Sequence, residues 1–368
     1  MERRAVWLSV PVGLLMAGCS GGTKAPIPAP GPPVNAPRHA RSQLLVLRNP
    51  PRADLVMIDA DGHRRRVIVG SSPEAGVRAV AGRPAWSADG RWIAFGAVVG
   101  RRTKPIDYPL TDLFLVRTNG SGLRRLTHTG SASTPTWSPD GRTIVFAAAT
   151  VFNGKPDLFR SQATSLWRMN SNGSDLHRLT PVVRGQIDEP GSFSPDGTRL
   201  AFTRLKPGFI DPHRGLIRDT GDIEVMHSHG SGLQKLATDS ADPAFSPDGH
   251  HIAFVSGKDR TGTIMIGEDE DAYANELYVM DADGHNFRRL THTAELSEIA
   301  PSWSPDGARI AYAREESGYT KVVAVTNADG SCGEEIASDR RGDIWYSQPA
   351  WRPGRARSGD GPLPCRHR

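Results

Sequence analysis

The chain has 368 residues, of which 38% are hydrophobic, and it contains 39 glycines and 29 prolines. Proline removes a backbone donor and glycine is costly to order, so this density excludes a fold of long helices and favours many short strands. The formal net charge of +5 comes from dispersed basic residues, which argues against nucleic-acid binding.

The first 19 residues have the pattern of a bacterial export signal. Arg3 and Arg4 precede an apolar stretch from Ala5 to Ala17, which is shorter than the about 20 residues that span a bilayer. Leu-Met-Ala-Gly before Cys19 resembles a lipobox, in which the cysteine is acylated and becomes the mature N-terminus. We expect residues 1–19 to be a lipoprotein signal peptide, with an ordinary cleaved signal as the alternative. A lipoprotein signal predicts export and lipid anchoring on the periplasmic or extracytoplasmic side of the cell envelope.

Residues 20–42 are rich in proline and alanine (KAPIPAPGPPVNAP) and lack a hydrophobic period. Such segments favour an extended polyproline conformation of about 3.1 Å per residue. We expect a disordered tether that separates a downstream domain from the membrane, which the chain would contact through its lipid alone.

Two sequence motifs alternate from residue 43 onward. The first motif, Pro-x-aromatic-Ser-x-Asp-Gly-x-x-apolar-x-aromatic, recurs at intervals of about 50 residues. Its copies begin at Pro84, Pro135, Pro190, Pro243 and Pro301, with a truncated sixth copy at Pro349. The second motif, as in DLFLVRTNGSGLRRLT, occurs six times and begins at Asp54, Asp112, Ser165, Asp222, Glu276 and Lys321.

Each motif predicts a β-hairpin. Asp-Gly and Asn-Gly accept the positive φ angles of tight hairpin turns, and the flanking residues alternate as in half-buried strands. Two hairpins per repeat predict a four-stranded antiparallel blade, and six blades predict an all-β, six-bladed β-propeller over residues 43–354. A basic tail, residues 355–368, would follow.

The motifs WSPDG-x-x-IAF and LYVMDADG-x-x-x-RRLT resemble the repeat of the TolB-type propellers, a family within the WD-repeat-like group. The resemblance extends over about Leu44 to Gly354 and implies the propeller fold. It also implies a family that includes both non-catalytic scaffolds and propellers beside peptidase domains. We expect no counterpart of that family's N-terminal domain here, because the Pro-rich segment occupies its place.

The ends of the repeat predict how the propeller closes. The chain starts with a lone strand at Gln43 and ends with a lone strand at Pro349. Paired in one sheet, they complete a blade with the C-terminal strand innermost and the N-terminal strand outside it.

The long connections predict the face that binds a partner. All tight Asp-Gly turns fall at one end of the blades, and the long connections fall at the other, where binding usually resides. Aromatic and arginine side chains amid polar neighbours are typical of protein interfaces, with solvated loop charge as the alternative. The predicted partner-binding residues are Arg101, Arg102, Tyr108, Arg160, Arg214, Arg218, Asp269, Asp271 and Tyr273.

The residues before each first strand predict a polar channel mouth, comprising Arg83, Asp188, Glu189, Asp242 and Gln348. Asp188, Glu189 and Asp242 could hold a hard cation such as Ca²⁺. The alternative, which we favour, is no metal or cofactor, with carboxylates solvated or paired with Arg83.

After Cys19, the remaining cysteines are Cys332 and Cys365. An exported chain meets oxidising conditions, and both residues are expected at the turn end of the blades, so they either form a disulfide or remain free thiols.

The sequence contains no His-Glu-x-x-His pair, no Gly-x-Ser-x-Gly elbow and no phosphate-binding glycine loop. We therefore predict a monomeric scaffold that binds a protein of the cell envelope and assign no catalytic residue. The alternative is carbohydrate or sugar-acid binding, including lyase-type chemistry, at the channel mouth.

Overall fold

A computed structural model describes residues 42–49, 53–72, 75–100, 110–149, 151–152, 155–156, 163–183, 185–205, 221–259, 263–265, 271–293, 296–316, 320–338, 345–354 and 361–365. These residues form β-strands and turns, without an α-helix. A membrane-spanning helix is likewise not found in this part of the chain. The predicted signal peptide and nearly all of the predicted tether, residues 1–41, lie outside the described residues.

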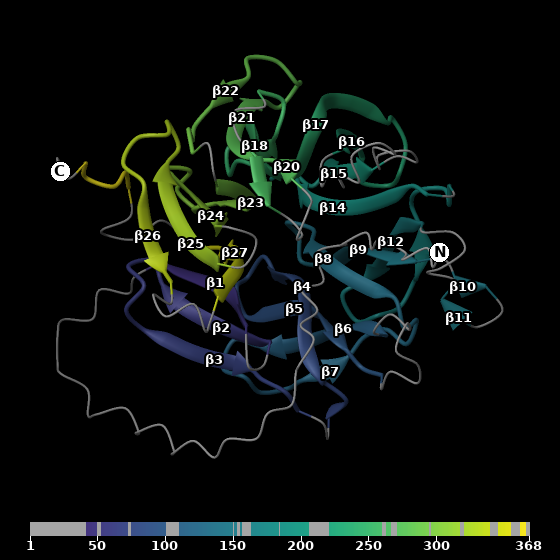
Figure 1. The fold of residues 1–368 in the computed structure, drawn as a ribbon. Coiled ribbons are helices and arrows are strands. Elements are labelled where there is room, and N and C mark those ends of the chain that lie inside the picture. The colour runs from purple at the N-terminus through teal and green to yellow at the C-terminus, as the bar shows by residue number, and fades with distance from the viewer. Residues whose placement is uncertain are drawn as a thin grey trace, which may run out of the picture.

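The strands form antiparallel four-stranded units that follow one another along the chain around a common centre (Figure 1). One sheet, in the order β27–β1–β2–β3, joins Trp345–Trp351, Gln43–Asn49, Asp54–Asp59 and Arg65–Val69. The next comprises β4 to β7, with bounds Ala79–Trp86, Trp92–Val98, Thr111–Arg117 and Arg124–Arg125. Another comprises β23 to β26, with bounds Leu296–Trp303, Arg309–Glu316, Thr320–Asn327 and Glu334–Ala337.

Three further units are joined into one eleven-stranded sheet. The first is β8, β9, β12 and β13, with bounds Ala132–Trp137, Thr143–Ala149, Thr164–Asn170 and His177–Arg178. The second begins with β14, β15 and β16, with bounds Ile187–Phe193, Arg199–Leu205 and Gly221–His227. The third ends with β18, β21 and β22, with bounds His251–Ser256, Glu276–Asp281 and Arg288–Arg289.

One long strand, β17 (Gln234–Phe245), belongs to two units. Its first half pairs with β16 and its second half pairs with β18, whereas the sequence motifs predicted two separate strands. The preceding junction is a single parallel pair between Thr164 and Ile187. The eleven-stranded sheet is therefore three of the predicted units in sequence.

Strand β27 pairs with β1 from Leu44↔Trp351 to Asn49↔Trp345, with one irregularity between Leu45 and Leu47. The first and last strands of the chain thus share a sheet, and the C-terminal strand lies on its first edge. This is the strand order that the incomplete terminal motifs predict.

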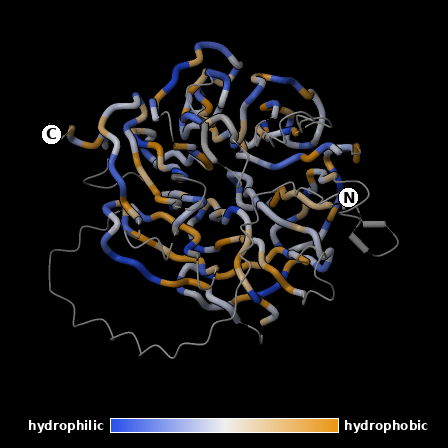
Figure 2. The backbone as a smooth tube through the Cα atoms, in the orientation of Figure 1, coloured by the Kyte–Doolittle hydropathy of each residue, from blue (hydrophilic) through white to orange (hydrophobic). Residues whose placement is uncertain are grey.

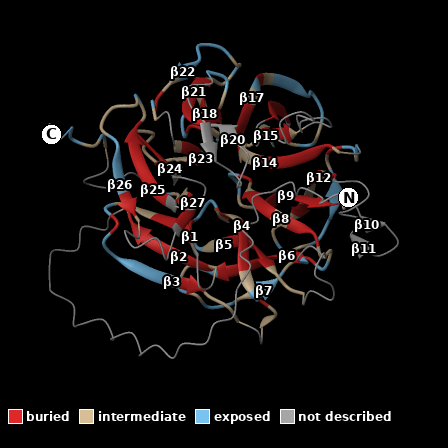
Figure 3. Cartoon of the chain, in the orientation of Figure 1, coloured by how far each residue is buried: buried red, intermediate tan, exposed pale blue. Residues whose placement is uncertain are grey.

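The hydrophobic core lies between adjacent sheets (Figures 2 and 3). One cluster packs Leu45 and Leu55 of the first sheet against Phe95 and Phe114 of the second. Equivalent clusters join each later pair of units. A further cluster joins Val56 of the first sheet to Val323 of the last, so the same packing links the two ends of the chain.

Glycines of the second hairpins let neighbouring sheets approach closely. Gly120 has φ +88°, and a Cβ there would lie 3.2 Å from the Ile68 carbonyl of the preceding sheet. Gly62 of the first sheet has φ +76° and faces the Ile336 carbonyl of the last sheet in the same way. Only glycine combines this backbone conformation with this proximity.

The first hairpins are fixed by their Ser-x-Asp sequence. Ser138 Oγ donates a hydrogen bond to Asp140 Oδ1 at 2.5 Å, and the Arg142 N–H donates to the same oxygen at 3.0 Å. Equivalent bonds recur in the turns at Ser87, Ser194, Ser246 and Ser304. The serine hydroxyl lowers the pKa of Asp140, and that of Asp196 falls to about 2.

Cys332 and Cys365 form a disulfide, with their Cα atoms 4.9 Å apart. Cys332 lies in the last turn of the β25–β26 hairpin, and Leu363 N–H donates to Asn327 Oδ1 at 2.5 Å. These contacts attach residues 361–365 to the turn end of the last sheet.

Candidate functional site

The candidate site is formed by the residues that precede proline in the first strand of each unit, the strands nearest the centre in Figure 1. These residues are Arg83, Thr134, Glu189, Asp242, Ala300 and Gln348. The pairing register shifts beside each of them except Glu189, where it shifts one step later. Four adopt positive φ, as at Asp242 (59°) and Gln348 (56°). Such bulges bend a strand and redirect its side chains.

Arg83 and Asp242 form an ion pair between sheets that are not neighbours in the chain. Arg83 lies on β4 and Asp242 on β17, and their side chains are only 19% and 15% exposed. The second carboxylate oxygen of Asp242 accepts the Ala300 N–H at 2.8 Å, while the Asp242 N–H donates to Thr203 Oγ1 at 2.9 Å. Asp242 therefore links β17 to three other strands through its side chain and backbone.

Glu189 is buried beside this pair. Burial raises the pKa of Glu189 to about 7, an effect that Arg83 opposes and Asp242 reinforces. The Glu189 carboxyl group is thus half protonated near neutral pH. At lower pH it is neutral, so Arg83, Asp242 and Glu189 together carry close to zero net charge.

Asp188 belongs to a second buried set. Arg204 donates from Nε and Nη2 to the two carboxylate oxygens of Asp188 at 2.8 and 3.0 Å. Its Nη1 donates to Glu224 Oε2 at 2.6 Å. A bidentate pair of this kind is strong and directional, so Asp188 is bound to Arg204 rather than turned toward Glu189 and Asp242.

The contacts of Asp188 and Asp242 bear on the predicted cation site. Asp188 pairs with Arg204 and Asp242 with Arg83, so the arginines already neutralise both carboxylates. Among the residues that the structure describes, no group of three or more His, Cys, Asp or Glu side chains could hold a metal ion.

Two polar atoms at the channel positions are buried without a hydrogen-bond partner in the described part of the structure: Thr134 Oγ1 and Gln348 Oε1. Sequence reasoning named Gln348 but missed Thr134, Arg204 and Glu224. Thr134 stands directly before Pro135, as Arg83 stands before Pro84. This shared position in the repeat is the signal that could have identified Thr134.

The predicted partner-binding face falls largely outside the described residues. This holds for Arg101, Arg102, Tyr108, Arg160, Arg214, Arg218 and Asp269. Asp271 and Tyr273 begin and end β20 (Asp271–Tyr273), which pairs with β19 (Thr263–Met265). A second small hairpin joins β10 (Val151–Phe152) to β11 (Lys155–Pro156).

The flanking strand pairs show where the long connections leave the sheets. Val98↔Thr111, Ala149↔Thr164, Arg204↔Asp222 and Ser256↔Glu276 close their hairpins at the end opposite the Asp-Gly turns. Ile187↔Leu205 and Asp188↔Arg204 lie at the same end. The Asp188–Arg204 set therefore lies at the strand ends from which these connections leave.

Comparison with known proteins agrees with this architecture. The chain is 23% identical over 301 residues to the Tol-Pal system protein TolB of Francisella tularensis subsp. mediasiatica, which is 82% of this chain and 59% of that protein. The structure of TolB from Acinetobacter baumannii matches 86% of this chain and 67% of its own, with a TM-score of 0.61 and 22% identity. The chain has a TolB-type β-propeller fold.

A further structure, from an Agrobacterium tumefaciens protein that carries the TolB name, matches the propeller with a TM-score of 0.53 and 17% identity. It covers 85% of this chain and 99% of its own. No protein-family model matches the chain. The chain spans 59% of the length of the Francisella TolB.

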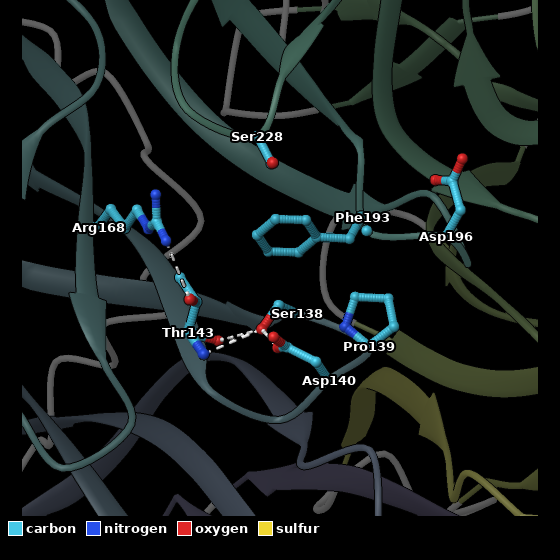
Figure 4. Close-up of a pocket in the computed structure, with 9 residues that line it drawn as sticks. Ser138, Pro139, Asp140, Thr143, Arg168, Phe193, Asp196 and Ser228 are labelled. Atoms are coloured by element: carbon cyan, nitrogen blue, oxygen red, sulfur yellow. Dashed lines mark hydrogen bonds between the residues drawn. The ribbon is translucent and has the colours of Figure 1, made fainter.

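The turn end of the propeller carries two adjoining pockets. One, of about 160 Å³, is formed by two successive first hairpins and the strand between them (Figure 4). The ring of Phe193 lies between Arg168 and Ser228 on one side and Pro139 and Asp140 on the other. The second, of about 380 Å³, includes Trp92, Trp137 and Arg124, and Asp140 lines both pockets.

The buried Glu189 gives the channel mouth a pH dependence. The folded pKa of about 7 lies above the ordinary value of 4.5, so folding favours the protonated form. Its contribution to stability is complete below pH 4.5 and is lost as the pH rises through 7. We expect Glu189→Gln to increase the free energy of unfolding by up to about 3 kcal/mol at pH 8, and to change it little at pH 4.

Denaturant unfolding at pH 4, 6 and 8 measures this effect. The exposed Glu334→Gln provides the matched control and should leave the pH profile unchanged. Parallel profiles for Glu189→Gln and the unmodified chain would show that Glu189 titrates normally.

Proposed function

We propose that the chain is an exported, lipid-anchored cell-envelope protein, a monomer whose closed, six-bladed propeller binds another protein and catalyses no reaction. In this proposal residues 1–19 are the signal peptide, Cys19 carries the lipid, and residues 20–42 form the tether. The propeller occupies residues 43–354, and residues 355–368 form the basic tail.

Two repeated contacts support a closed six-bladed ring. Hydrophobic clusters join each unit to the next, and one joins the last sheet to the first. The close contact of a turn glycine with a carbonyl of the preceding sheet also repeats. Gly120 lies against Ile68, and Gly62 of the first sheet lies against Ile336 of the last. Because each interface follows the same geometry, a ring accommodates the first-to-last contact without an exposed sheet face.

The observation that carries the binding proposal is the position of the long connections. Four of them leave the propeller at one end, and Asp188 and Arg204 lie at the strand ends there. A rigid scaffold that presents long loops on one face is suited to protein recognition. The arginines already neutralise Asp188 and Asp242, which favours protein binding over capture of a sugar acid.

The relatives suggest the class of partner. A curated relative is named as a protein of the Tol-Pal system, and that name motivates a search for a protein partner in the envelope. The partner of this chain is proposed by class alone, as another envelope protein.

Site-specific photo-cross-linking in intact envelopes tests the proposal. A photoreactive residue replaces Tyr108 or Tyr273 on the long-connection face, and Asn286 at the turn end serves as control. We expect a discrete protein adduct from the first two positions, at least several-fold more abundant than from Asn286. An adduct from Asn286 alone would contradict the assignment of the face.

The lipid anchor is tested separately with Cys19→Ser. Mass spectrometry of the mature chain should show acylation that this substitution abolishes, and the variant should leave the membrane fraction. A mature chain that starts elsewhere and lacks acyl groups would remove this part of the proposal.

A further inference from the structure

The two pockets at the turn end adjoin at Asp140, and we call the pair the aromatic groove; its lining includes Trp92, Trp137 and Phe193 together with Asp89, Asp140 and Asp196. The Arg117 and Arg124 guanidinium groups lie 4.9 and 5.9 Å from the Trp92 ring. The groove spans three successive units, because Trp92, Trp137 and Phe193 come from β5, β8 and β14.

Trp137 carries an unused donor. Its indole Nε1 is buried and has no partner in the described part of the structure. At the same repeat position, Trp86 and Trp303 donate to the carbonyls of Ala350 and Ala244 at 3.0 Å each, whereas the Trp351 indole is, like that of Trp137, without a partner among the described residues. A buried donor without a partner is costly, so a carbonyl acceptor that reached Trp137 Nε1 would be stabilising.

The beginning of the described chain lies next to this groove. Arg352 donates from Nη1 to Gln43 Oε1 at 2.8 Å and from Nη2 to the Gly90 carbonyl at 3.2 Å. Gly90 ends the turn whose Ser87 and Asp89 line the larger pocket. The Arg352 side chain therefore connects Gln43, where the N-terminal segment joins the propeller, to the turn that lines the groove.

We propose that the Pro-rich segment at residues 25–37 of this same chain docks in the aromatic groove. It contains six prolines: Pro26, Pro28, Pro30, Pro32, Pro33 and Pro37. Pro-rich segments in polyproline conformation bind aromatic grooves because their shape is preformed and their carbonyls remain free to accept hydrogen bonds. The Trp137 N–H is the expected donor to one of these carbonyls.

The length of the connecting residues and the charges that flank the prolines both suit this segment to the groove. Five residues, 38–42, separate Pro37 from Gln43, and they can extend at most about 18 Å. The basic residues Lys24, Arg38 and Arg41 flank the prolines, while Asp89, Asp140 and Asp196 line the groove. The short Ser-to-Asp hydrogen bonds hold these carboxylates in the ionised form, which complements the flanking charges.

Nuclear magnetic resonance of the indole N–H groups tests the proposal on residues 19–368, with serine in place of Cys19 so that the chain carries no lipid. The six prolines are replaced by serine in one variant, which keeps the length of the segment. We expect the Trp92 and Trp137 indole signals to shift and the Trp137 N–H to lose its protection from exchange. The Trp303 signal, whose donor is already used, should not move.

A second variant, Trp92→Ala, removes a wall of the groove and should produce the same loss of Trp137 protection with the prolines intact. A synthetic peptide of residues 20–42, added to the proline-free chain, should restore the original signals. Identical Trp137 signals in the unmodified and proline-free chains would overturn the proposal. Signals that depend on protein concentration would also overturn it, since a second copy would then occupy the groove.

Discussion

Removal of the last strand is expected to abolish cooperative folding of the propeller. A chain that ends at residue 344 lacks β27, and with it the buried side chains of Tyr346 and Trp351. Loss of a buried tryptophan alone typically costs about 3–5 kcal/mol, against a total stability of about 5–15 kcal/mol for a typical domain. Thermal melting followed by circular dichroism should lack the sharp transition of the full chain.

The physical reason is that β27 bonds to sheets on both sides. The Trp86 indole donates to the Ala350 carbonyl at 3.0 Å. The backbone N–H of Trp351 donates to Ser302 Oγ at 3.1 Å. A chain that ends at Gly354 is the matched control, because it loses the Cys332–Cys365 disulfide and the tail but keeps β27. Equal melting of the chains that end at 344 and 354 would contradict ring closure by this strand.

The second large effect is expected at Asp112, whose side chain is fully buried. Its carboxylate accepts hydrogen bonds from Arg125, from Thr127 Oγ1 at 2.7 Å and from the Thr129 N–H at 2.9 Å. Asp112→Ala leaves the Arg125 guanidinium group, the buried Thr127 hydroxyl group and the Thr129 N–H without their acceptor. We expect the free energy of unfolding to fall by about 3–5 kcal/mol.

Chemical denaturation measures the loss at Asp112. The exposed Asp283→Ala is the control and should change the stability by about 0.5 kcal/mol or less. Asp112→Asn, which keeps the size but not the charge, should fall between the two. A loss at Asp112 no larger than at Asp283 would show that the buried network does not stabilise the sheet.

The same network explains one of the sequence motifs. Glu276 accepts from Arg289 and from Thr291 Oγ1, each at 2.6 Å, as Asp112 does from Arg125 and Thr127. The RRLTHT stretch of the second motif thus returns to the acidic residue that begins the preceding strand. In these two sheets the stretch binds the neighbouring strand through its arginine and threonine side chains.

The sequence predicted the repeat, the turns and the pairing of the terminal strands because each depends on local chemistry. Asp-Gly and Asn-Gly specify tight turns, and alternating apolar residues specify strands. The ion pair between Arg83 and Asp242 joins residues 159 positions apart, and its geometry exists only once separate sheets assemble. Local patterns in the sequence carry no information on a contact between residues so far apart.

The buried Arg204 was equally hidden from sequence reasoning. It stands in the strand RLAFTRL, where its charge suggests an exposed position. Asp188 and Glu224 on the neighbouring strands neutralise it, so it is 7% exposed. Burial of a charge depends on partners from other strands, which a single strand sequence does not specify.

If Cys19 carries a lipid, as proposed, the entry point of the chain at Gln43 would set the orientation of the molecule on the membrane. Gln43 pairs with Asp59, directly before the Asp-Gly turn, so the N-terminal segment emerges at the turn end. With a lipid on Cys19, the turn end would face the bilayer and the long connections would point away from it. A docked Pro-rich segment would hold the propeller close to the lipid surface, and its release would extend the reach of the loops toward a distant partner.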